Sequence, residues 1–115
     1  MLTLCGISNC DSCRKARKWL DAAGIDYRFH DLRGDGLDRS MLNRWATVVG
    51  WRTLLNTRST TWRSLPEAEK QDIDERKAID LMCAHPTLVK RPVAESGDDI
   101  VVGFSPGAYE ALGPG

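Results

Sequence analysis

Hydrophobic and polar positions recur with periods that predict strands and a helix in the first third of the chain. Residues 2–7 form a short apolar run, which is typical of a buried strand. Apolar and small residues recur on one helical face over residues 11–23, and Gly24 stands where a C-terminal cap belongs. Residues 25–32 alternate apolar with polar side chains, the period of a half-exposed strand. This order predicts a β-α-β unit.

The middle of the chain has no strand pattern between residues 37 and 88 and is predicted to be helical. Asp38 or Ser40 can cap its first helix. The sequence Ser-Leu-Pro-Glu at residues 64–67 combines a capping box with a proline in the first turn, and predicts that another helix begins there. A last helix is predicted over residues 74–84, before a His-Pro pair that ends it.

The final segment returns to strands and ends in a short helix. Apolar runs at residues 92–95 and 100–104 flank a Ser-Gly-Asp-Asp turn, which predicts a hairpin. A helix is predicted over residues 105–112, and residues 113–115 close the chain. The whole order is β-α-β, a helical block and β-β-α. With no repeat and no linker, residues 1–115 are predicted to form one domain with a helical insertion at about residues 34–88.

Composition counts against a nucleic-acid partner and against a membrane or secreted location. The 115 residues include 16 Lys and Arg and 16 Asp and Glu, so the formal net charge is zero. A broad nucleic-acid groove needs a basic surplus, so we expect no direct nucleic-acid partner. Apolar stretches are too short to span a membrane, and the start lacks the pattern of a secretory signal. We therefore expect a cytoplasmic monomer without membrane contact.

A Cys-x-x-Cys motif lies between the first strand and the following helix, at Cys10 and Cys13. Unpaired N–H groups and the positive end of the helix dipole stabilise a thiolate at Cys10, and Arg14 adds a positive charge nearby. Cys10 is predicted to be the nucleophile, with Cys13 as the candidate thiol that resolves a mixed disulfide. This motif inside a β-α-β unit is typical of the thioredoxin-like class.

Metal sites are the alternative use of the cysteines. The chain has four, which are Cys5, Cys10, Cys13 and Cys83. Their spacing matches a plant-type iron-sulfur pattern, but Cys5 lies in a strand and Cys13 in a helix, whereas that pattern needs an irregular loop. A zinc site would need a second paired motif, and His30 and His85 have no ligand spacing between them. We expect no bound metal or cofactor, and we expect Cys5 and Cys83 to be small buried apolar residues.

Several segments resemble the arsenate reductase family of the ArsC and Spx type. They are residues 10–20 (CDSCRKARKWL), 54–63, 81–93 and 102–104. The resemblance runs nearly end to end, and residues 6–11 and 50–63 are most similar to the YffB-like branch, whose members are described as glutathione-dependent thiol reductases. It implies an α/β thioredoxin-like fold with a helical insertion and a mixed four-stranded sheet.

The resemblance also implies roles for individual residues. In the arsenate reductases, the cysteine that matches Cys10 attacks arsenate, arginines hold the oxyanion, and glutathione and glutaredoxin complete the reduction. Arg58 and Arg91 match two of these arginines, and guanidinium groups suit an oxyanion or a glutathione carboxylate. Pro92 matches a cis proline beside the active-site cysteine, where exposed backbone can pair with a substrate chain. The residues expected to contact the substrate are Asn9, Arg14 and Pro92.

Two departures from the family pattern shape the functional prediction. A third arginine would fall near Gly103, and a histidine would stand at Gly6, four residues before the nucleophile. Both departures count against efficient arsenate reduction. We therefore expect a cytosolic thiol reductase whose Cys10 attacks a disulfide, a glutathione adduct or an arsenate-like oxyanion. The alternative is an Spx-like regulator that binds RNA polymerase through a Cys10/Cys13 redox switch.

Overall fold

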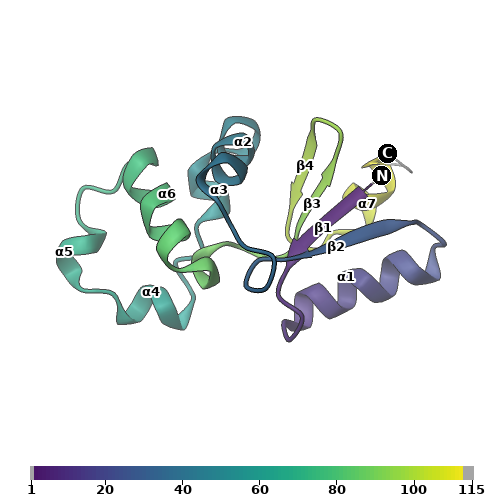
Figure 1. The fold of residues 1–115 in the computed structure, drawn as a ribbon, viewed down its shortest axis with the longest axis horizontal. Helices are drawn as coiled ribbons and strands as arrows, with labels where there is room; N and C mark the ends of the chain where they lie inside the picture. Colours follow the sequence, from purple (N-terminus) through teal and green to yellow (C-terminus); the bar gives the residue numbers. More distant parts are fainter. Residues whose placement is uncertain (1, 113–115) are drawn as a thin grey trace. The chain divides into compact units, whose positions relative to one another are not determined.

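A computed structural model describes residues 2–112, which form two compact units (Figure 1). The α/β unit takes the described residues of Met1–Gly36 and Arg91–Gly115, and the helical unit is Leu37–Lys90. The predicted closing segment, residues 113–115, lies outside the described residues. Within residues 2–112, no helix combines the length and the apolar character needed to cross a membrane.

The α/β unit is built on a mixed four-stranded sheet with the order β2-β1-β3-β4 (Figure 1). Its elements are β1 (Leu2–Gly6), α1 (Asp11–Ala22), β2 (Tyr27–Asp31), β3 (Val93–Ser96), β4 (Asp99–Val102) and α7 (Pro106–Leu112). Strand β1 pairs in parallel with β2, where Leu4 lies opposite Phe29, and antiparallel with β3, where Leu4 lies opposite Ala94. Strands β3 and β4 form the predicted hairpin. The predicted mixed sheet is confirmed.

Helices α1 and α7 cover the same face of this sheet. The buried cluster between them consists of Leu2, Leu4, Ala16, Leu20, Ala94 and Tyr109. Helix α1 contributes the apolar face predicted from its spacing, and it ends before Gly24, whose φ of 69° suits a residue without a Cβ. This packing holds α1 against β1, and it thereby fixes the position of the loop that joins the two elements and of the first turn of α1.

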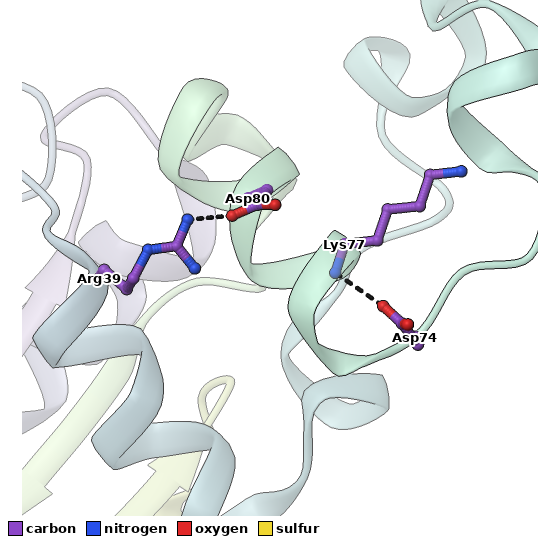
Figure 2. Close-up of polar contacts among 4 residues, drawn as sticks. All are labelled: Arg39, Asp74, Lys77 and Asp80. Carbon is purple, nitrogen blue, oxygen red and sulfur yellow. Dashed lines mark hydrogen bonds and ion pairs between the residues drawn. The ribbon is translucent and has the colours of Figure 1, made fainter.

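The helical unit contains short helices joined by capped turns. They are α2 (Arg39–Val49), α3 (Trp51–Leu54), α4 (Thr60–Ser64), α5 (Glu67–Lys70), α6 (Glu75–Ala84) and the 3-10 helix η1 (Pro86–Leu88). Asp38 caps α2, accepting from the Met41 N–H at 2.8 Å. Asp74 caps α6 by accepting from the Lys77 N–H at 2.8 Å (Figure 2). An ion pair between Arg39 and Asp80 links α2 to α6 (Figure 2).

A helix begins within residues 64–67 as predicted, at Glu67, but the predicted cap by Ser64 is wrong. Ser64 is instead the last residue of α4, which is capped by Ser59 through a 3.1 Å hydrogen bond from the Trp62 N–H. Leu65 is extended because it precedes Pro66, whose ring disfavours the helical conformation in the residue before it. Pro66 then precedes α5 without a capping bond from its own side chain. Residues 59–64 therefore hold a cap and a short helix.

Candidate active site

Cys10 is placed where the chain leaves β1 and enters α1. Its N–H donates to the Ile7 carbonyl at 3.2 Å, and its carbonyl accepts from the Arg14 N–H at 2.9 Å. Cys10 is the N-cap residue, with extended backbone (φ −97°, ψ 129°), and its side chain makes no regular capping hydrogen bond. The first-turn N–H groups therefore remain available to a negative charge at this half-buried sulfur.

The pKa of Cys10 is lowered from the ordinary value. Burial by itself acts to raise this pKa, but three interactions of the thiolate outweigh it. They are with the backbone N–H of Cys13, the thiol of Cys13 and the guanidinium of Arg91. A thiolate is the reactive form of cysteine in nucleophilic attack, so Cys10 has the electrostatic environment of an activated nucleophile.

Cys13 has the opposite character, although it lies one turn away. Its side chain is fully buried. Burial is the main cause that raises the pKa of Cys13 to about 11. The Ile7 N–H acts to lower this pKa, the thiol and the charge of Cys10 raise it further, and Arg91 lowers it slightly. The two thiols therefore ionise in a defined order: Cys10 carries the negative charge while Cys13 stays protonated and interacts with it.

Arg91 supplies positive charge to the Cys10 thiolate from the residue before β3. Its Nε and Nη1 atoms are buried and have no hydrogen-bond partner among residues 2–112. Buried guanidinium N–H groups normally have hydrogen-bond partners, so these two unsatisfied donors near Cys10, the predicted nucleophile, are unusual. The charge of the guanidinium suits a carboxylate or an oxyanion near Cys10.

The Arg91–Pro92 peptide bond is cis, as the resemblance implies. Pro92 is buried, and its carbonyl accepts from the Gly103 N–H at 2.7 Å. The Tyr109 hydroxyl donates in turn to the Gly103 carbonyl at 3.1 Å. The carbonyl of Pro92 is thus already engaged within the protein, and its contact with a substrate chain stays a prediction.

The other predicted substrate contacts lie on the surface of the α/β unit. Asn9 is exposed immediately before the nucleophile. Arg14 is also exposed and forms an ion pair with Asp11, and it is not among the groups that shift the pKa of Cys10. Arg14 lines a hollow of about 480 Å³ along α1, together with Asp11, Lys15, Arg17, Lys18 and Asp21. Asn9 is not part of this lining.

Arg58 belongs to the helical unit. It is exposed and lines a polar pocket of about 380 Å³ with Asn56, Thr57 and Lys90. No acidic side chain lines this pocket, so its chemistry suits an anionic group. The predicted cooperation of Arg58 with Cys10 stays a prediction.

The remaining cysteines differ from each other. Cys5 is buried, with 1% of its surface exposed, as predicted. Cys83 was predicted to be buried and is half-buried, because it lies in the last turn of α6 with Arg39 and Asp80 nearby. Among residues 2–112, no three His, Cys, Asp or Glu side chains lie together as metal ligands.

The sequence did not predict that Tyr109 and Gly6 lie close to Cys13. Tyr109 is buried close enough to Cys13 for the charge of that thiol, after burial, to raise the tyrosine pKa. Gly6 lies against Cys13: a Cβ on Gly6 would stand 2.5 Å from the Cys13 Sγ atom. The sequence signal for Gly6 is its missing side chain where the family pattern has a histidine, whereas nothing in the local pattern points to Tyr109.

Known proteins similar to this chain agree with the architecture. A family model described as the ArsC family matches residues 5–112. A solved structure of the YFFB (PA3664) protein is 50% identical, with a TM-score of 0.94, covering 97% of this chain and 98% of that one. The predicted thioredoxin-like fold and the resemblance to the YffB-like branch are confirmed.

Two curated relatives extend the comparison. An uncharacterised protein of Haemophilus influenzae is 42% identical over 96% of this chain and 97% of its own length. The global transcriptional regulator Spx of Streptococcus pyogenes serotype M3 is 29% identical over 91% of this chain and 79% of its own length. Because the family model spans almost the whole sequence, the chain belongs to the ArsC family.

Proposed function

We propose that this protein is a thiol-dependent reductase in which Cys10 attacks a disulfide and glutathione is the co-substrate. The observation that carries the proposal is the arrangement of Cys10, Cys13 and Arg91. It combines a thiol of lowered pKa at a helix N-terminus with a guanidinium that has two unsatisfied donors. Membership of the ArsC family, and the resemblance of the sequence to the YffB-like branch, support the same proposal.

In the proposed reaction, the Cys10 thiolate attacks the glutathione sulfur of a mixed disulfide. A Cys10–glutathione bond forms as the old disulfide bond breaks, and the substrate thiol leaves as a thiolate that takes up a proton. The positive charge of Arg91 keeps Cys10 in its thiolate form and attracts a glutathione carboxylate to the site. A second glutathione, or a glutaredoxin, then removes the adduct and restores Cys10.

The test is glutathione-linked reduction of a mixed disulfide by the wild-type protein, Cys10→Ser and Cys83→Ser. We expect Cys10→Ser to lose activity by several orders of magnitude, because it removes the nucleophile. Cys83→Ser is the matched control, since it removes a half-buried thiol of raised pKa in the other unit. Equal activity of wild type and Cys10→Ser would overturn the proposal.

A second candidate is a redox-sensing regulator of the Spx type. It is favoured by the Spx relative and by the proximity of Cys10 to Cys13, whose oxidation to a disulfide would remove the thiolate charge. Affinity capture of RNA polymerase by the oxidised and the reduced protein separates the two candidates. Capture in one redox state only supports the regulator, and no capture in either state rules it out.

A further inference from the structure

Gly6 ends β1 directly beneath the motif that carries the two thiols. A Cβ built on Gly6 would lie 2.5 Å from the Cys13 Sγ, 3.4 Å from the Cys13 Cβ and 3.7 Å from the Phe29 ring. The overlap therefore concerns the sulfur, whereas the other two distances are those of close but ordinary contacts. The Cys13 sulfur occupies the space that a side chain at position 6 would fill.

The backbone gives no separate reason for a glycine at this position. Gly6 is a strand residue and is not one of the glycines with positive φ, so its conformation is open to any residue. This contrasts with Gly24, Gly50 and Gly103, whose φ angles of 69°, 84° and 84° favour glycine. The absence of a side chain at Gly6 therefore serves packing, and what it makes room for is the Cys13 thiol.

We propose that Gly6 is a positioning residue: its empty side-chain space seats the Cys13 sulfur against Cys10, ready to close a Cys10–Cys13 disulfide. The proposal rests on the proposed function, which it deepens by assigning the second step to a seated dithiol. In that step the Cys13 thiolate attacks the Cys10 sulfur of the Cys10–glutathione adduct. The Cys10–Cys13 bond forms, the Cys10–glutathione bond breaks, and glutathione leaves as a thiolate that takes up a proton.

The charges around Cys13 support this sequence of events. In the free protein, burial raises the pKa of Cys13 and the Cys10 thiolate raises it further, while the Ile7 N–H and Arg91 act in the opposite direction. Once Cys10 is in an adduct, its negative charge is gone, while the Ile7 N–H and Arg91 remain. Reaction of Cys10 therefore removes one of the effects that keep Cys13 protonated, so Cys13 ionises more readily in the adduct than in the free protein.

A side chain at position 6 and the Cys13 sulfur would occupy the same space in this protein. The sulfur is held between β1 and the first turn of α1, and both elements are fixed by the core that includes Leu4 and Ala16. A methyl group at position 6 must therefore displace the sulfur or shift a packed element, because interiors are close to fully packed. Displacement of a reacting sulfur by about 1 Å can cost on the order of a hundredfold in rate.

The experiment is a double-mutant cycle with Gly6→Ala, Cys13→Ala and the two combined. The wild type and Gly6→Ala are treated with oxidised glutathione, and mass spectrometry follows conversion of the Cys10 adduct into the Cys10–Cys13 disulfide. We expect Gly6→Ala to slow this closure by on the order of a hundredfold. We also expect Gly6→Ala to lower Tm by about 5 °C when Cys13 is present. It should leave Tm unchanged when Cys13 is Ala, because the overlapping sulfur is then absent.

Gly107→Ala is the matched control, because Gly107 lies in α7 with no atom within 4 Å of an added Cβ. It should close the disulfide at the wild-type rate and keep Tm. Closure at the wild-type rate in Gly6→Ala, or an equal loss of Tm with and without Cys13, would overturn the proposal. Neither readout depends on turnover, so an inactive wild type would overturn the reductase proposal and leave the role of Gly6 to be decided by this cycle.

Discussion

Cys10 and Cys83 are both half-buried thiols, one in each unit, and their surroundings give them opposite acidity. Cys10 stands at the N-terminus of α1 with the Arg91 guanidinium beside it, and its pKa is lowered. Cys83 stands in the last turn of α6, and burial, with Asp80 and Asp38, raises its pKa although Arg39 acts to lower it. Exposure is alike at the two sites, so helix polarity and neighbouring charge decide which thiol is reactive.

This comparison also shows why a single arginine is insufficient to activate a thiol. Arg39 faces Cys83, but it is paired with Asp80, whose carboxylate offsets its charge (Figure 2). Arg91 has no acidic partner among the groups that act on Cys10, and two of its donors are unsatisfied within residues 2–112. The candidate active site therefore differs from the surroundings of Cys83 in two ways: Cys10 stands at the start of a helix, and the guanidinium that acts on it has no acidic partner among the groups that act on Cys10.

The largest expected difference is in alkylation of the two thiols. With limiting iodoacetamide near neutral pH, we expect Cys10 to react first and Cys83 to react more slowly. The ratio should be about tenfold for each unit by which their pKa values differ, since the thiolate is the reacting form. Peptide mapping by mass spectrometry gives both rates in one sample. Equal rates for Cys10 and Cys83 would show that the helix end and Arg91 do not set thiol reactivity here.

A smaller effect is expected from removing the charge of Arg91. Arg91→Met should raise the pKa of Cys10, because it removes a charge and a hydrogen bond that stabilise the thiolate, and so slow its alkylation near neutral pH. Arg14→Met is the control, because Arg14 is paired with Asp11 and does not act on the Cys10 thiolate. The measurement is the rate of Cys10 alkylation against pH. A shift of the profile in Arg14→Met as large as that in Arg91→Met would contradict the assignment.

The smallest expected effect is on alkaline stability. The pKa of Cys13 is about 11 in the folded protein and is 9.0 for an ordinary cysteine, so the folded state holds this proton more tightly. Its contribution to stability is therefore present below about pH 9 and is lost as the pH rises toward 11. Cys10 acts oppositely: its lowered pKa contributes at high pH and is lost as the pH falls through the folded-state value.

The check is Tm against pH for the wild type and for Cys13→Ala. We expect the wild type to lose a few degrees more than the variant between pH 9 and 11, because only the wild type has the Cys13 proton to lose. Parallel curves for the two proteins would show that the burial of Cys13 carries no linkage to folding.

Much of the fold could be predicted from local patterns. The strand at residues 2–7 and the α1 face with Ala16 and Leu20 follow from short-range periodicity, and the structure has both. Gly24 follows from the backbone conformation that a helix end needs. The wrong cap predicted at residues 64–67 arose because two overlapping signals competed. Ser59 caps an earlier helix, and the residue before Pro66 cannot continue it.

The candidate site was less accessible to local reasoning. Arg91 follows Cys10 by about eighty positions in the chain, and only the pairing of β1 with β3 brings the start of β3 to the start of α1. The sequence marks Gly6 only as a departure from the family pattern, and its contact with the Cys13 sulfur becomes visible only when α1 is packed against β1. Pairwise contacts of this kind depend on register and on which side chains point to which face, and neither is encoded in a short window.

The sequence by itself determined the order of elements, the position of Cys10 at a helix start and the family resemblance, because periodicity, capping and the Cys-x-x-Cys motif are local properties. Only the tertiary structure decided which charge is left unpaired beside Cys10, and that Cys13 is buried against Gly6. The reason is physical: thiol acidity depends on burial and on charges within a few ångströms, and those neighbours come from β1, α1 and the segment before β3, which meet only when the sheet has formed.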